Sequence, residues 1–223
     1  MLIGVIMAKN VLIGVFMMKK TVAIIFAFIM VFGFASCSEE REFTLGTVNG
    51  NTYENEFIGI GYTLDEDWSF VSKDDLLAEM GIDATLTGDE LQAEINKTDI
   101  VCDMDASTGE GTESVFVQVK NMGMVFGKII GEDKYIDMWQ DGLEKEYSES
   151  GKFDEVVYTR DSVNLCGRSC KSLNTHLVSG EANVYQKAAF IKIDGYMIEI
   201  VVTSVTGWDA VDGIFDNFYS LAD

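Results

Sequence analysis

The chain contains no proline and only one histidine, His176, among its 223 residues. Without proline, its turns depend on glycine, asparagine and aspartate, which tolerate the backbone angles that tight turns need. One histidine excludes a metal site built from several histidines, although it could join carboxylates or act as a general base. His176 lies in an apparent strand at residues 174–177, and we interpret it as a structural or surface residue.

Basic residues are also scarce, because 16 Lys and Arg face 37 Asp and Glu, which gives a formal net charge of −21. Such a charge repels nucleic acid and anionic lipid headgroups. It favours cationic partners, divalent ions or simple solubility. We therefore expect no nucleic-acid partner.

The sequence lacks the common signatures of catalysis. No serine lies in a Gly-x-Ser-x-Gly pattern, and no glycine-rich loop could hold a phosphate group. Asp103 and Asp105 resemble the start of a calcium loop, but Thr108 stands at its sixth position and Ser114 at its twelfth, where glycine and glutamate are needed. These two acids are weak metal candidates, and we predict no cofactor and no enzyme. An enzyme with an acid-rich cleft, acting by acid–base chemistry or with a metal, is the alternative.

The first 36 residues have the order of a bacterial export signal. Lys19 and Lys20 precede an apolar run at residues 22–34, and Ala35 and Ser36 stand just before Cys37. Thirteen apolar residues are too few to span a bilayer, which favours a cleaved signal over a transmembrane anchor. The cysteine after two small residues resembles the lipobox of bacterial lipoproteins. We predict that Cys37 is the lipidated first residue of a mature protein on the extracytoplasmic face of a cell membrane.

Residues 1–17 are apolar but add no second recognisable element, and a misassigned start at Met17 or Met18 would explain them. Removal of residues 1–36 discards three lysines and no acid, so the mature chain has 13 basic and 37 acidic residues and a net charge of −24. We expect residues 37–52 to form a tether, and residues 53–223 to form one folded domain.

Three cysteines remain after lipidation, in a compartment where thiols can oxidise. Cys166 and Cys170 would be roughly 13 Å apart in one extended strand, too far for a disulfide. A hairpin that turns at Gly167 and Arg168 would bring them together, so both a local bridge and free thiols remain open. We interpret Cys102 as a buried free thiol.

The mature chain alternates between helical and strand patterns. Helices are expected near residues 74–80, after Thr87, at residues 132–149 and at residues 208–221, and the last two carry aromatic stripes at helical spacing. Strands are expected at eight further segments, with hairpins at residues 99–122 and at Asp194-Gly195. The expected strand segments are residues 57–62, 99–106, 115–122, 156–159, 163–166, 169–178, 184–193 and 196–204. We interpret the stripe with Tyr135, Met138 and Trp139 as a buried face, although an aromatic binding groove would show the same spacing.

The order of these features resembles the PsbP/DcrB-like family: an apolar strand and turn leading to Trp68, a hairpin, a long amphipathic helix, Gly167, Asp194-Gly195 and a closing helix. The resemblance covers residues 53–221. It implies an α+β fold in one domain, with an antiparallel sheet flanked by helices, and a domain used for docking. The turn before Trp68 lacks the proline common in that family, and no functional motif of the family is present. We therefore predict a binding or accessory module with an envelope protein as partner. The sequence identifies no small ligand.

Overall fold

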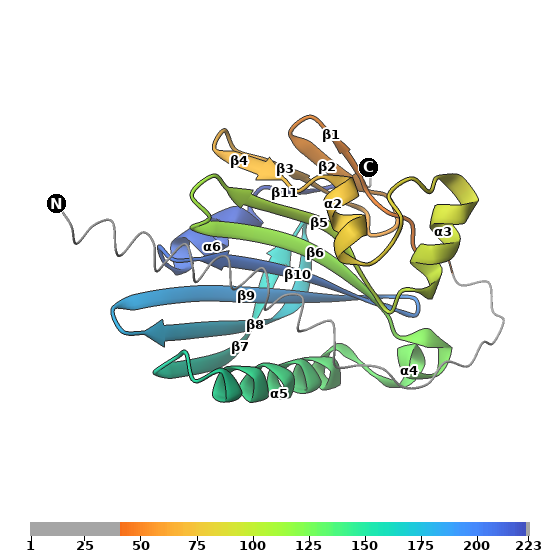
Figure 1. Ribbon diagram of the computed structural model, residues 1–223. Helices are drawn as coiled ribbons and strands as arrows, with labels where there is room; N and C mark the ends of the chain where they lie inside the picture. Colours follow the sequence, from red (N-terminus) through yellow and green to blue (C-terminus); the bar gives the residue numbers. More distant parts are fainter. Residues whose placement is uncertain (1–40, 222–223) are drawn as a thin grey trace.

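The computed structural model describes residues 41–221, without the side chain of residue 124. Its largest element is a seven-stranded antiparallel sheet with the strand order β4-β5-β6-β10-β9-β8-β7 (Figure 1). The strands are β4 (Trp68–Phe70), β5 (Ile100–Thr108), β6 (Glu113–Asn121), β7 (Glu155–Leu165), β8 (Arg168–Ser179), β9 (Ala182–Ile193) and β10 (Tyr196–Ser204). The predicted export signal and Cys37 lie outside the described residues.

A second, four-stranded sheet has the order β1-β2-β3-β11 and combines strands from both ends of the described chain. Its members are β1 (Thr47–Asn49), β2 (Thr52–Asn55), β3 (Ile60–Thr63) and β11 (Phe218–Ser220). Phe43, which precedes β1, is only 2% exposed. The folded part of the chain therefore begins well before Tyr53, inside the segment that the sequence predicted to be a tether.

Five helices complete the described residues and cover both faces of the large sheet. They are α2 (Lys73–Glu79), α3 (Gly88–Lys97), α4 (Gly123–Ile129), α5 (Glu132–Ser150) and α6 (Trp208–Phe215). One apolar cluster joins the large sheet to the small sheet and α6, and a second joins its opposite face to α5. The α+β class predicted from the sequence, an antiparallel sheet flanked by helices, is confirmed.

Helix α5 matches its prediction closely because its local signals agree. Gly151 ends it in the left-handed conformation, at φ 59°, which a glycine adopts without steric cost. Tyr135, Ile136 and Leu143 are buried against the sheet, whereas Met138 is 47% exposed and does not belong to the buried face.

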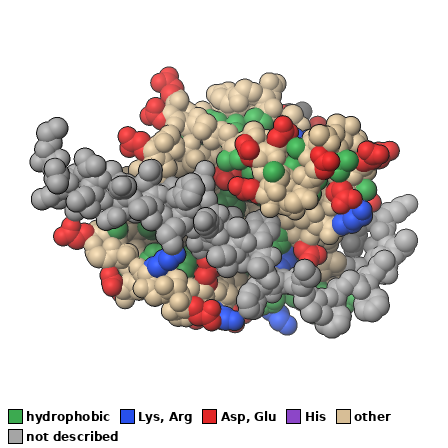
Figure 2. All heavy atoms as spheres, viewed as in Figure 1, with side chains coloured by type: hydrophobic (Ala, Val, Ile, Leu, Met, Phe, Trp, Pro, Cys, Tyr) green, Lys and Arg blue, Asp and Glu red, His purple; other side chains and the backbone are tan. Residues whose placement is uncertain are grey.

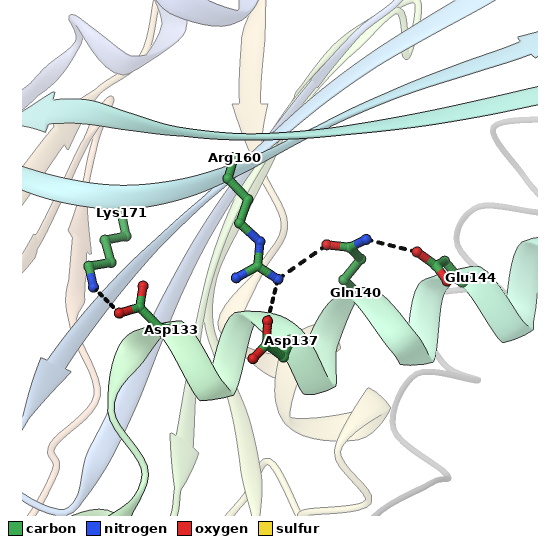
Figure 3. A network of polar contacts seen from close by, with 6 residues as sticks. All are labelled: Asp133, Asp137, Gln140, Glu144, Arg160 and Lys171. Carbon is green, nitrogen blue, oxygen red and sulfur yellow. Dashed lines mark hydrogen bonds and ion pairs between the residues drawn. The ribbon is translucent and has the colours of Figure 1, made fainter.

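The solvent-facing side of α5 is bonded to the sheet edge by charged residues (Figure 3). Arg160 on β7 contacts Asp137 at 2.6 Å, and Lys171 on β8 contacts Asp133 at 2.5 Å. Gln140 accepts a hydrogen bond from Arg160 at 3.3 Å. These acids, which the sequence marks only as a polar face, therefore fix the helix over β7 and β8.

The end of the chain differs from its prediction. The expected helix over residues 208–221 stops at Phe215, and Phe218 lies in β11, opposite Tyr62 of β3. Phe218 has the helical spacing, but its backbone pairs with a strand far away in the sequence. The two segments predicted within residues 156–166 are likewise one continuous strand, β7.

Candidate functional site

A groove of about 590 Å³ lies between β1 and the segment that runs from β4 into α2. Its walls are mixed, with apolar side chains from several elements and few charged ones. The side chains that line it include Leu45, Val48, Trp68, Phe70, Lys73 and Met80. In the upper part of Figure 2, apolar side chains are visible between acidic ones over the region where β1, β4 and α2 meet.

Two strand edges face this groove. β1 stands at one end of the small sheet and β4 at one end of the large sheet, and within the described residues each has only one strand neighbour. Val48 on β1 is 48% exposed. An edge strand presents backbone N–H and C=O groups that can pair with another extended chain.

Asp103 lies behind the groove and links the two sheets. The register of β5 and β6 shifts between Cys102 and Met104, so that Asp103 is the extra residue of a β-bulge. Its Oδ1 accepts a hydrogen bond from the backbone N–H of Gly46 at 2.7 Å. Its Oδ2 accepts hydrogen bonds from Asn55 Nδ2 at 2.6 Å and from the Tyr53 hydroxyl. A bulge redirects a side chain, and this one turns a carboxyl group toward β2.

Burial sets the proton affinity of this carboxyl group. Asp103 is 7% exposed, and removal from water raises its pKa, while the hydrogen bonds from Tyr53, Gly46 and Asn55 act in the opposite direction. Burial also raises the pKa of Tyr53, and the nearby Asp103 carboxyl raises it further. The hydroxyl therefore stays protonated and acts as a donor.

The two weak metal candidates differ in their surroundings. Both oxygen atoms of Asp103 already accept hydrogen bonds from the protein, whereas Asp105 is half-buried in the wall of the groove. Over residues 41–221, no group of three or more His, Cys, Asp or Glu side chains is arranged to hold a metal ion.

A second buried acid, Glu199 on β10, lies on the opposite face of the large sheet, under α5. It is 1% exposed, and burial raises the pKa of its carboxyl group. Trp139 Nε1 donates to it at 3.1 Å, and the Tyr135 hydroxyl and Gln118 Nε2 also donate to it. Gln118 stands directly across the strand pair from Glu199. With both oxygens occupied and α5 above, Glu199 fixes the helix to the sheet.

Lys120 is a cation whose charge acts on the carboxyl group of Glu199. It is 7% exposed, its Nζ has no hydrogen-bond partner, and burial lowers its pKa. Its charge lowers the pKa of Glu199, against the larger effect of burial. Lys120 and Glu199 therefore interact electrostatically, without a direct hydrogen bond between them.

The cysteine hairpin turns one residue earlier than expected. Leu165 pairs with Arg168, so Cys166 and Gly167 form the turn, with φ 53° and 80°. Cys170 then faces Val163 across the strands and not Cys166. A two-residue turn of this kind needs two positive φ angles, which fixes the register. Cys102, Cys166 and Cys170 are free thiols in the structure, and the local bridge between Cys166 and Cys170 is not formed.

His176 on β8 contacts two side chains of β9. Its Nε2 lies 3.0 Å from Asn183 Oδ1, and its ring stacks on Tyr185 with 4.6 Å between ring centroids. His176 does not line the groove, and its contacts with Asn183 and Tyr185 do not include Asp103 or Glu199. No local pattern marks Glu199, Tyr53 or Asn55, since their importance depends on partners 48 to 81 positions away.

None of the helices within the described ranges is both long enough and apolar enough to cross a membrane. No protein-family model matches the chain, and no curated protein matches it.

Solved structures with similar architecture have low sequence identity to this chain. One is the solution structure of cyanobacterial PsbP (CyanoP) from Synechocystis sp. PCC 6803, with 12% identity and a TM-score of 0.45 over 83% of this chain and 98% of that chain. Another is a crystal structure from Bacteroides thetaiotaomicron VPI-5482, with 8% identity and a TM-score of 0.38 over 78% of this chain and 49% of that chain.

A third is LpqN, described as involved in cell envelope biogenesis of Mycobacterium tuberculosis. It has 12% identity and a TM-score of 0.34, over 72% of this chain and 82% of that chain. These likenesses concern the arrangement of helices and strands.

Proposed function

We propose that this protein is a lipid-anchored extracytoplasmic binding module, and that its groove accepts an extended segment of a partner protein. The observation that carries the proposal is the groove of about 590 Å³ between the edge strands β1 and β4. The lipidated Cys37, predicted from the export signal before it, supplies the membrane attachment.

The groove suits an extended polypeptide for two reasons. A strand added beside β1 or β4 would satisfy backbone groups on the free edge of that strand. Its alternate side chains would point into the groove, where Val48, Trp68 and Met80 offer apolar contacts.

Charge adds a second condition on the partner. The mature chain has a net charge of −24, so a segment with basic residues beside its apolar positions would be attracted to this surface. Lys73 is the cationic side chain in the lining of the groove, which also includes the acids Asp103 and Asp105. We therefore expect the bound segment to be apolar at alternate positions and basic at its ends.

A defined peptide can test the groove directly. The probe is a fluorescent peptide of alternating valine and serine flanked by lysines, and its binding to the purified full chain is followed by fluorescence anisotropy. Val48→Glu puts a carboxylate into the apolar groove and should weaken binding about tenfold or more. Hydrogen exchange with bound peptide should show new protection in β1 or β4.

Val157→Glu is the matched control, because Val157 is 42% exposed on β7, an edge strand that does not line the groove. It should bind the peptide as the unchanged chain does. Equal weakening by both substitutions, or protection confined to other strands, would contradict the proposed site. Mass spectrometry of the mature N-terminus tests the anchor separately, since an unmodified Cys37 would exclude it.

An acid-cleft enzyme is the competing proposal, and it requires several carboxyl groups with shifted pKa values in one cleft. Asp103 and Glu199, whose pKa values burial raises, face opposite sides of the large sheet. Each is bonded to side chains that link it to a neighbouring element. This separation favours the binding module.

A further inference from the structure

Helix α4 carries a row of exposed apolar side chains. Val125 is 57% exposed, Phe126 is 50% exposed and Ile129 is 68% exposed. The helix contains no acid, and its one charged residue is the exposed Lys128. Contiguous apolar surface of this kind marks a protein or membrane contact.

The fold holds this apolar face outward. On the inner side of α4, Gly127 lies so close to the hairpin between β9 and β10 that a Cβ atom there would stand 2.9 Å from the Cα of Gly195. The N–H of Met122 donates to the carbonyl of Gly195 at 2.9 Å. Lys192 Nζ donates to the carbonyl of Ile130 at 3.0 Å. Both ends of α4 are therefore attached to the hairpin, beside which the helix lies in Figure 1.

The same hairpin receives the start of the described chain. Arg41 Nε lies 3.4 Å from Asp194 Oδ2, next to Gly195 in the hairpin turn. The N–H of Phe43 donates to the hydroxyl of Tyr196 at 3.4 Å. Arg41 follows Cys37 by four positions, and a fully extended chain spans at most about 14 Å over four positions. A lipid on Cys37 must therefore enter the bilayer close to this end of the molecule.

We propose that the apolar face formed by Val125, Phe126 and Ile129 inserts into the surface of the membrane that holds the Cys37 lipid. This inference rests on the proposed lipid anchor and adds the orientation of the domain. The anchor and α4 then form two membrane contacts at one end, and the groove is held in a fixed orientation to the bilayer. Two weak membrane signals together give stable attachment where one is marginal.

A bilayer fits this face better than another occupant for reasons of charge and position. Because α4 has no acids, lipid phosphates are not repelled at the point of contact. The methylene chain of Lys128 can lie along the apolar surface while its ammonium group contacts a headgroup. The short reach from Cys37 to Arg41 keeps this end of the molecule close to the bilayer. A partner protein would have to reach the same face within the space between the domain and the membrane.

Tryptophan substitution reports the depth of this face. The full chain is purified from bacterial membranes and placed in vesicles of phosphatidylcholine with brominated acyl chains. Interfacial contacts bury side chains about 5 to 10 Å deep, where bromine atoms quench tryptophan fluorescence. The emission that Phe126→Trp adds should therefore be about twofold or more lower than in vesicles without bromine. Ile129→Trp is a second probe on the same face. Val157→Trp is the control, since β7 begins beyond the far end of α5, a helix about 28 Å long.

A photoactivatable phosphatidylcholine gives a readout on the unsubstituted chain, and its products should map to the peptide that contains residues 123–129. Mass spectrometry of the same preparation reads the lipid on Cys37. If Cys37 is lipidated but tryptophans at 126 and 129 are quenched no more than one at 157, the inference is wrong and the anchor stands. Lipid products that map to other parts of the chain and not to residues 123–129 also overturn it. If Cys37 carries no lipid, the proposed anchor fails and the inference fails with it.

Discussion

Asn55 on β2 donates a hydrogen bond from Nδ2 to Oδ2 of Asp103 on β5 at 2.6 Å, across 48 positions of the chain. With the bonds from Tyr53 and Gly46, it connects the small sheet to the bulge of the large sheet. Because Leu45 and Val48 line the groove on the same segment, the shape of the groove depends on this carboxyl group.

Asp103→Ala should therefore lower the stability of the protein and also weaken peptide binding in the groove. The substitution removes the acceptor of three donors, of which Tyr53 and Asn55 are buried, and we expect the free energy of unfolding to fall by about 3 kcal/mol. Urea denaturation measures this change. Asp105→Asn, on the same strand, should cost less than about 1 kcal/mol. Equal losses from both substitutions would show that the hydrogen bonds of Asp103 are not the cause.

Glu199 should make stability depend on pH in a defined direction. Burial raises its pKa above the ordinary value of 4.5, so the folded protein binds the proton more tightly than the unfolded chain. The contribution of Glu199 to stability is then complete below the unfolded pKa and decreases as pH rises through the folded pKa.

Glu199→Gln should remove this pH dependence, because the amide keeps the shape of the neutral acid and can still bond Trp139 and Tyr135. Its stability relative to the unchanged chain should increase with pH, as measured by denaturant unfolding at several pH values. Glu199→Ala leaves the donors unpaired and should cost about 3 kcal/mol or more throughout. A constant difference between the Gln variant and the unchanged chain would show that Glu199 does not titrate in this way.

Two helical glycines should respond to alanine with opposite signs. Gly142 in α5 has no atom within 4 Å of an added Cβ, so Gly142→Ala should stabilise the protein by about 0.5 to 1 kcal/mol. Gly127→Ala would place its Cβ 2.9 Å from the backbone of Gly195 and should destabilise by about 1 to 2 kcal/mol. Thermal unfolding of the pair tests the attachment of α4, and stabilisation by both would contradict it.

The cysteine hairpin should carry free thiols in the mature protein. Cys166 is half-buried in the turn, whereas Cys170 is 3% exposed and burial raises its pKa to about 11. A maleimide added to the folded protein should label Cys166 before Cys170, as peptide mass spectrometry would show. An intact mass lower by two hydrogen atoms without reductant, with both cysteines unlabelled, would instead indicate a bridge.

Local patterns predicted most of the secondary structure. Residues 132–149 have apolar side chains at helical spacing and a glycine beyond the end, and α5 occupies Glu132–Ser150. Asp194 adopts φ 51° in the hairpin that Asp-Gly predicted. Local patterns also misled, because Phe218 fits the spacing of the helix before it and yet pairs with β3.

The sequence by itself determined the class of fold, since the period of its apolar residues and its turn residues act over a few neighbouring positions. It also determined the acidity of the chain and the prediction of a lipid on Cys37. Only the tertiary structure decided that Asp103 meets Asn55, that Glu199 lies under α5, and that α4 turns its apolar face outward beside Arg41. These contacts join residues far apart in the chain, and which of many acids and apolar side chains meet depends on strand order, bulges and register.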